Sequence, residues 1–245
     1  MDPSYDLWTR VACEFIGTAI LIILGNGAVA NVHLKGSKGY GGGWSLIAMG
    51  YGFGVMIPAV MFGGISGNHI NPAFTIGLAT WGLFPWSNVA PYIAAQMLGA
   101  MAGQVAIVLT HKPYYDRTTS TDDVLATFST VNAARSRVNG FANELLGSVV
   151  LFSCALALVH SPLTATEPAV AHVAIGFLVW GLVAGLGGPT GPALNPARDL
   201  GPRIVHALLP LKHKGGSDFR YGWVPVAAPI VAGVIGVGGW KLLLG

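Results

Sequence analysis

The chain carries very little charge for its length. Lys and Arg number 13 and Asp and Glu number 10 among 245 residues, so only 9% is charged, against about 25% in an ordinary soluble domain. Residues 39–111 contain none of these four residue types. Because so few charges cannot cover a surface in contact with water, the composition excludes a soluble enzyme, a disordered tail and a coiled coil.

Other features that would indicate a metal, a cofactor or a nucleic-acid partner are also absent. The two cysteines, Cys13 and Cys154, lie in apolar stretches and have neither metal-ligand spacing nor the pattern of a disulfide framework. The net charge is only +3, and no run of Lys or Arg is long enough for a nucleic-acid patch or a polybasic lipid anchor. No Gly-rich phosphate loop opens a helix. The sequence therefore predicts no metal, no cofactor and no nucleic-acid partner.

Apolar residues and glycine are plentiful instead. The hydrophobic share is 53%, the mean hydropathy is +0.60 and there are 35 glycines, which suits helices packed closely in a bilayer. A crossing helix needs about 20 apolar residues. The stretches of that length are roughly 8–32, 44–63, 89–110, 139–160, 169–187 and 223–244. We therefore predict an all-α membrane protein with six transmembrane helices, multi-pass in the cell membrane.

Two further apolar stretches, roughly 71–83 and 195–209, have half the length needed and open with the same tripeptide. The tripeptides are Asn71-Pro72-Ala73 and Asn195-Pro196-Ala197. Glu14 and Glu144 also sit at matching places near the start of spans one and four. Each half, about 8–110 and 139–244, holds three spans, so the second copy is inverted within one transmembrane domain covering 1–245. Inverted repeats place their working site near the membrane midplane, at broken helices.

The tripeptide is a helix start signal, because Asn is a favoured N-cap and Pro fits the first helical position. Two half-helices entering from opposite faces bring two positive dipole ends and two Asn amides together, which repels cations and offers donors to neutral solutes. The non-helical residues before them supply carbonyl acceptors: Gly67, Asn68, His69, Gly191, Ala193 and Leu194. We interpret Glu14 and Glu144 as structural acceptors for the backbone N–H groups of these re-entrant loops; proton carriage is the alternative.

With its two Asn-Pro-Ala boxes, its two Glu-x-x-Gly helices and the strings SGNHINPA and GPALNPARDLGP, the chain resembles the major intrinsic protein family, the aquaporins and glycerol facilitators. The resemblance implies six tilted helices plus two re-entrant half-helices, one pore per subunit and a homotetramer. It also implies that both termini are cytoplasmic. The loops after spans one, three and five hold nearly all the Lys and Arg, so the positive-inside rule predicts the opposite orientation; we follow the resemblance.

Residue matching within the family also predicts a branch and a filter. An acid, Asp199, directly follows Arg198, and in this the chain resembles the glycerol-conducting branch. The four positions of the family's constriction correspond to Tyr51, Val183, Pro192 and Arg198, a combination that matches neither the usual water filter nor the usual glycerol filter. Pro192 stands where glycerol channels have a bulky aromatic ring, which indicates a wider opening. We expect a passive channel for water, glycerol, dihydroxyacetone and undissociated lactic acid.

Two other readings remain open at this level. Some members that the chain resembles serve as scaffold or junction proteins with a closed pore. Separately, Gly64-Ile65-Ser66-Gly67 looks like the motif of rhomboid intramembrane serine proteases, for which His172 would be the base. We favour the channel because the second Asn-Pro-Ala box has no purpose in a protease.

Overall fold

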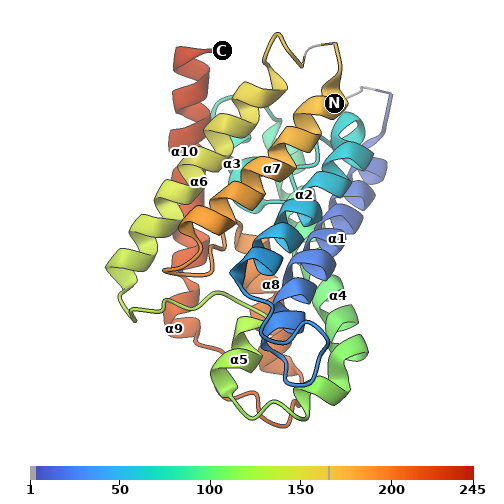
Figure 1. The fold of residues 1–245 in the computed structure, drawn as a ribbon. Coiled ribbons are helices and arrows are strands. Elements are labelled where there is room, and N and C mark those ends of the chain that lie inside the picture. The colour runs from blue at the N-terminus through green and yellow to red at the C-terminus, as the bar shows by residue number, and fades with distance from the viewer. Residues whose placement is uncertain (1–3, 165) are drawn as a thin grey trace.

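The computed structural model describes residues 4–164 and 166–245. All the regular secondary structure in these residues is helical. Figure 1 shows the elements as a bundle of long, tilted helices around two short ones. The elements are α1 (Leu7–His33), α2 (Trp44–Ser66), α3 (Pro72–Thr80), η1 (Trp86–Asn88), α4 (Val89–Tyr115), α5 (Thr121–Ala126), α6 (Arg137–Val159), α7 (Pro168–Leu186), α8 (Pro196–Leu208), α9 (Phe219–Gly222) and α10 (Val224–Leu243).

Within the described residues, six helical stretches are long and apolar enough to cross a membrane: the helices α1, α2, α6 and α7, and the stretches Trp86–Tyr115 and Phe219–Leu243 that contain α4 and α10. Their ends lie within a few residues of the predicted spans, because the uncharged stretches are as long as the helices they form. The two half-length stretches form α3 and α8, each with Asn at the N-cap and Pro in the first turn. The predicted fold class is confirmed.

The helix contacts repeat between the two halves. In the first half α1 packs on α2 and α4, and in the second half α6 packs on α7 and α10 in the same way. The half-helices cross over, since α3 packs against α10 and α8 against α4. In Figure 1, α3 lies in the upper half of the bundle and α8 in the lower half. The inverted repeat thus brings the starts of both half-helices to the centre.

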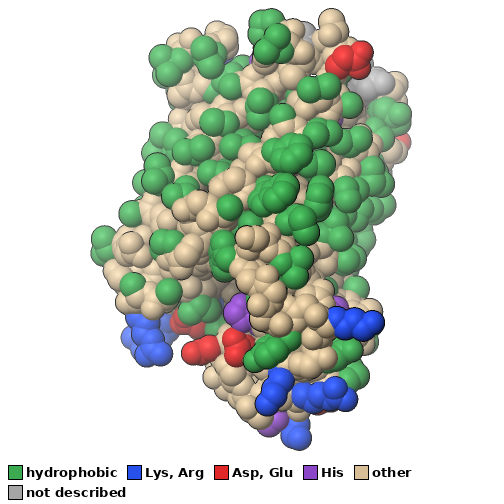
Figure 2. Space-filling view, viewed as in Figure 1, with side chains coloured by type: hydrophobic (Ala, Val, Ile, Leu, Met, Phe, Trp, Pro, Cys, Tyr) green, Lys and Arg blue, Asp and Glu red, His purple; other side chains and the backbone are tan. Residues whose placement is uncertain are grey.

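The two ends of the bundle differ in charge. The start of α1 and the end of α10 lie at the same end of the molecule, which an even number of crossings requires (Figure 1). On the face shown in Figure 2, apolar side chains cover the middle, and most Lys and Arg lie at the end opposite the chain termini.

Large apolar side chains point outward from the spans, among them Ile57, Leu98, Leu109, Phe177 and Ile235. This belt is the surface that lipid would cover.

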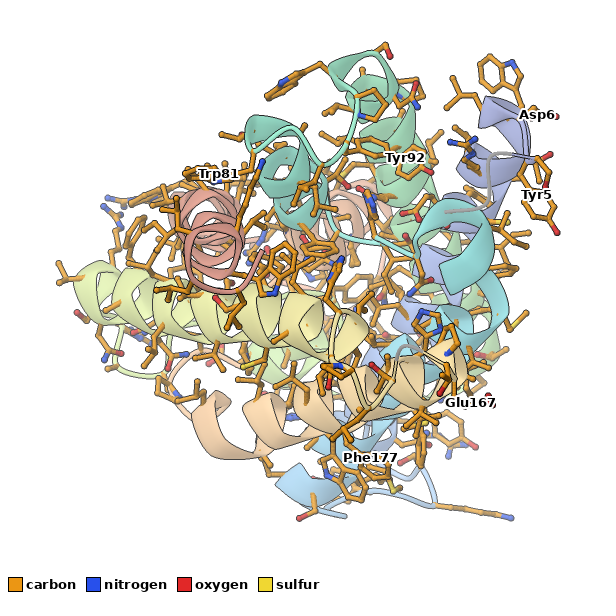
Figure 3. The ribbon with its side chains drawn as sticks, turned by 90° about the horizontal axis from the view of Figure 1, so that it is seen from above. Tyr5, Asp6, Trp81, Tyr92, Glu167 and Phe177 are labelled. Atoms are coloured by element: carbon orange, nitrogen blue, oxygen red, sulfur yellow. The ribbon has the colours of Figure 1, made fainter. Side chains whose placement is uncertain are left out.

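The half-helix α3 lies directly against α10 because both helices have glycine at their contact. A Cβ added at Gly233 would stand 2.3 Å from the carbonyl oxygen of Ala73, and one at Gly77 would stand 2.6 Å from that of Gly233. Above this contact Trp81 lies between the two helices (Figure 3) and donates its Nε1–H to the carbonyl of Val234 at 2.8 Å. The backbone approach fixes where α3 stands.

Replacing Gly233 with alanine is therefore expected to destabilise the protein by roughly 1–3 kcal/mol, the usual cost of inserting a methyl group into tight packing. Thermal unfolding in detergent measures this. Gly239→Ala on the same helix is the matched control, because a Cβ there meets nothing within 4 Å. Equal melting temperatures for both variants would contradict the close approach.

Candidate functional site: two re-entrant loops and a cavity

The loop before α3 is held by the carboxylate of Glu14, which lies fully buried in α1. Its Oε1 accepts hydrogen bonds from the backbone N–H of His69 at 2.9 Å and from the hydroxyl of Ser66 at 2.7 Å. Its Oε2 accepts from the backbone N–H of Ile70 at 2.6 Å and from the amide of Gln96 at 2.8 Å. Four donors compensate the cost of burying this carboxylate away from water.

Glu144 holds the loop before α8 in the same manner. Its Oε1 accepts from the backbone N–H of Ala193 at 2.9 Å and the hydroxyl of Thr190 at 2.8 Å, and its Oε2 accepts from the N–H of Leu194 at 2.9 Å. Glu144 is also fully buried. The two acids thus tie a non-helical loop to the first long helix of each half.

These loops need such ties because their backbone adopts unusual angles. Ile70 and Leu194, which precede the two Asn residues, have φ of 40° and 53°, a left-handed conformation that is costly for residues other than glycine and most of all for a β-branched side chain. In both residues the backbone N–H is the group that the buried Glu binds. The carboxylates therefore stabilise the conformation that turns each carbonyl toward the other half.

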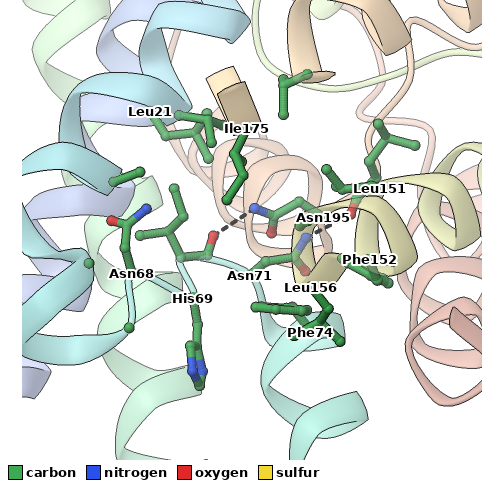
Figure 4. Close-up of a pocket in the computed structure, with 18 of the residues that line it drawn as sticks. Leu21, Asn68, His69, Asn71, Phe74, Leu151, Phe152, Leu156, Ile175 and Asn195 are labelled. Carbon is green, nitrogen blue, oxygen red and sulfur yellow. Dashed lines mark hydrogen bonds between the residues drawn. The ribbon is translucent and has the colours of Figure 1, made fainter. Parts of the chain in front are cut away.

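The two Asn side chains connect the halves at the centre (Figure 4). Asn71 Nδ2 donates to the carbonyl of Leu194 at 2.8 Å, and Asn195 Nδ2 donates to the carbonyl of Ile70 at 2.7 Å. Their Oδ1 atoms cap the half-helices, accepting from Ala73 N–H at 3.0 Å and Ala197 N–H at 2.9 Å. Each amide carries two hydrogens, and the bond between the loops uses one of them.

A cavity of about 360 Å³ runs along these loops. Both Asn residues line it, together with the predicted carbonyl residues Gly67, Asn68, His69, Ala193 and Leu194, and apolar side chains including Leu21, Phe74, Leu151 and Ile175 make up much of the remaining wall, as Figure 4 shows. Such a lining, mostly apolar with a line of polar groups, is typical of a small-molecule site.

A second cavity, of about 170 Å³, lies toward the end of the molecule opposite the chain termini. Three of the four filter residues, Tyr51, Val183 and Arg198, line both cavities. Pro192 lines the larger cavity and Gly191 the smaller one. The predicted filter set therefore lies at the boundary between two hollow spaces, which is where a constriction would select solutes.

The filter set combines one charged wall with apolar ones. The Arg198 guanidinium lies over the Tyr51 ring, 4.7 Å from its centroid, and its Nη2 donates to the Tyr51 hydroxyl. Among the described residues nothing accepts a hydrogen bond from its Nε or Nη1, although the side chain is buried. The backbone carbonyl of Val183 accepts from Nε1 of Trp44 at 2.7 Å, which fixes α7 on that side. The arrangement offers donors to a solute that carries oxygen.

Asp199 forms an ion pair with Arg203 and not with Arg198. Its Oδ1 accepts from Nε of Arg203 at 2.8 Å, with both side chains fully buried, and its Oδ2 accepts from the N–H and the hydroxyl of Thr130. Arg203 also donates to the carbonyl of Thr130. This pair fastens the loop around Thr130, which lines the smaller cavity, and Arg198 takes no part in it.

The groups nominated for a protease have other partners. The Ser66 hydroxyl donates to Glu14, and the ring of His172 packs against Gly63. The ring of His69, beside the first box, packs against Phe84 and Tyr92 with centroid distances of 4.8 and 5.2 Å. In the part of the chain that the structure describes, no group of three His, Cys, Asp or Glu side chains could hold a metal ion.

Several residues of the site were not predicted from the sequence. Gln96 donates a hydrogen bond to Glu14, and the carbonyl of Ile70 accepts one from the amide of Asn195. Asn26 binds the hydroxyl of Tyr51 at 2.5 Å, and Trp44 binds Val183. A buried amide in an uncharged apolar helix is itself a signal, because such a group must find a partner, so Asn26 and Gln96 could have been singled out.

Comparison with known proteins agrees with this geometry. The description "Major intrinsic protein" belongs to the family profile that matches residues 3–239. Glycerol uptake facilitator protein-like 5 of Lactiplantibacillus plantarum is 52% identical, covering 100% of both chains. A glycerol facilitator-aquaporin of Lactococcus lactis subsp. cremoris is 47% identical over 96% of this chain and 98% of its own. The X-ray structure of the aquaglyceroporin from Plasmodium falciparum superposes with a TM-score of 0.85 at 28% identity, covering 98% of this chain and 97% of that one. The chain belongs to the major intrinsic protein family.

Proposed function

We propose that this protein is a passive transmembrane channel for glycerol, water and similar small uncharged solutes, and not an enzyme. The observation that carries the proposal is the pair of cavities that meet at Tyr51, Val183 and Arg198. The relatives named as glycerol facilitators support the choice of solute. The two halves, about 8–110 and 139–244, would form one channel domain, with the Asn-Pro-Ala boxes at its centre.

The polar groups along the cavity suit a hydroxylated solute. Arg198 and the Asn amides are donors, and the loop carbonyls are acceptors, so a polyol can exchange its hydrogen bonds with water for bonds with the wall. The apolar remainder of the wall, including Phe74, Leu151 and Ile175, suits the carbon side of the same molecule. Fully charged solutes are disfavoured because losing their water in this narrow space is costly.

The direct test is stopped-flow swelling of proteoliposomes in a glycerol gradient. Vesicles that contain the protein are expected to take up glycerol and water faster than empty vesicles. Equal rates would instead support the closed-pore reading, in which the protein is a scaffold. A peptide-cleavage assay on the same vesicles should show no activity.

Dihydroxyacetone and undissociated lactic acid belong to the same proposal, since both are small neutral molecules with hydroxyl and carbonyl oxygens. We expect lactic acid to enter faster at about pH 4 than at about pH 7, because a carboxylic acid with a pKa near 4 is about half protonated at the lower pH and almost fully ionised at the higher one. Influx of labelled lactic acid at constant total concentration measures this. A flux that follows the concentration of the lactate anion would contradict the neutral-cargo mechanism.

The proposal extends to the orientation and the assembly of the channel. Both termini would be cytoplasmic, as the family resemblance implies, with the basic loops outside. Protease access to a tag after Gly245 in right-side-out vesicles tests this, because a cytoplasmic tag is protected. The proposed assembly is a homotetramer within the bilayer. The outward apolar side chains of the spans are compatible with contacts between copies. Native mass spectrometry is expected to detect a complex of four chains, and a smaller complex would contradict the tetramer.

A further inference from the structure

Asn26 of α1 and Gln104 of α4 are two fully buried amides that line neither cavity. Polar groups are costly to bury in an apolar bundle unless they are hydrogen-bonded. Neither amide belongs to the Asn-Pro-Ala boxes or to the Glu-centred loop anchors, so their presence needs its own explanation.

The two amides form a directed chain of hydrogen bonds that ends at the filter. Asn26 Nδ2 donates to Gln104 Oε1 at 2.7 Å and to the carbonyl of Phe128 at 3.0 Å. Both hydrogens of the Asn26 amide are thereby engaged, so its Oδ1 must face the other way. That oxygen accepts from the Tyr51 hydroxyl at 2.5 Å.

The chain determines where the hydroxyl hydrogen of Tyr51 points. A guanidinium has only donors, so the Tyr51 oxygen must accept from Arg198, and Asn26 takes the hydroxyl hydrogen so that a lone pair of this oxygen faces the guanidinium. Nη2 of Arg198 makes that bond, and the ring lies beneath the guanidinium. The remaining Nε and Nη1 find no acceptor within the described residues, which leaves them for a solute.

The ring itself has little freedom to compensate. A Cβ at Gly25 would stand 2.2 Å from the Tyr51 ring, so the ring already lies tightly against the backbone of α1. Because Gly25 and Asn26 are neighbours, one stretch of α1 sets both the position of the ring and the direction of its hydroxyl.

We propose that Asn26, held by Gln104, is a positioning residue for the filter: it directs the Tyr51 hydroxyl so that Arg198 presents two free donors to a polyol. This rests on the proposed channel function. Glycerol needs donors at a defined spacing, whereas water adapts to a single one, so the residue would set the ratio of glycerol to water permeability rather than the flux alone.

The test is a double-mutant cycle in proteoliposomes. Asn26→Leu, which keeps the side-chain volume, is expected to lower the glycerol-to-water ratio about threefold to tenfold, the effect of losing one hydrogen bond. In a Tyr51→Phe background, where no hydroxyl remains, the same change should leave the ratio as it is. Asn26→Asp, which keeps an acceptor for Tyr51, should stay nearer to wild type.

Thr18→Val is the matched control, since Thr18 is equally buried in α1 and, among the described residues, its hydroxyl is hydrogen-bonded only to the carbonyl of Glu14 in its own helix. If the effects of Asn26→Leu and Tyr51→Phe multiply, Asn26 does not act through Tyr51 and the proposal is wrong. Should Asn26→Leu not fold, Gln104→Met is used, with a smaller fall in the ratio that also disappears beside Tyr51→Phe. A wild-type protein that passes water but excludes glycerol would refute both the proposed solute and this proposal. A wild-type protein that passes glycerol, with a ratio that Asn26→Leu leaves unchanged, would refute this proposal alone.

Discussion

Replacing Glu144 with leucine is expected to prevent the protein from folding into a functional channel. The change removes the acceptor for the backbone N–H groups of Ala193 and Leu194 and for the hydroxyl of Thr190. Each buried donor left without a partner costs about 1–3 kcal/mol, so three of them cost about 3–9 kcal/mol, a large part of the stability of an ordinary protein. Leu194 would also lose the bond that holds its left-handed backbone. Size-exclusion profiles in detergent and vesicle swelling measure the loss.

Two variants separate this explanation from a general loss of an acid. Glu144→Gln keeps one carbonyl oxygen but turns an NH₂ group toward a donor, so an intermediate loss of stability is expected. Glu167→Leu makes the same substitution at an exposed position in the turn before α7, and wild-type behaviour is expected. A stable, permeable Glu144→Leu protein would show that the loop before α8 does not depend on this carboxylate.

The spans and half-helices could be predicted from the sequence because each depends on local information. An uncharged stretch of sufficient length can only be a buried or membrane helix, and Asn-Pro-Ala starts a helix whatever surrounds it. Glu14 and Glu144 were likewise interpreted as acceptors for the re-entrant loops, since a charged group among apolar residues needs donors and the non-helical loops have free N–H groups. Their contacts are of this kind.

The cross-connections could not be predicted, because they depend on distances between segments far apart in the chain. Asn71 and the carbonyl of Leu194 are 123 residues apart, and Asn26 and Gln104 are 78 apart. The sequence offers several buried amides and many carbonyls, and only the packing of α1 on α2 and α4 decides which of them meet. The partner of Asp199 was also open, since Arg198 and Arg203 are both near it in sequence.

Pro192→Phe is expected to narrow the opening enough to stop lactic acid and slow glycerol while water still passes. Pro192 is buried where the loop before α8 meets the larger cavity, next to Ala193 and six residues before Arg198. A phenylalanine side chain is much larger than a proline ring, and position 192 lines the larger cavity. The effect should increase with solute size, since water is the smallest of the three.

Swelling rates for water, glycerol and lactic acid at about pH 4, where about half of the acid is neutral, measure the change. Pro189→Phe is the control, because it lies in the same loop but lines neither cavity. If both variants slow all solutes equally, the loop has been disturbed and width is not the cause. If Pro192→Phe leaves the lactic acid flux unaffected, the width of the opening at position 192 does not limit which solutes pass, and the prediction is wrong.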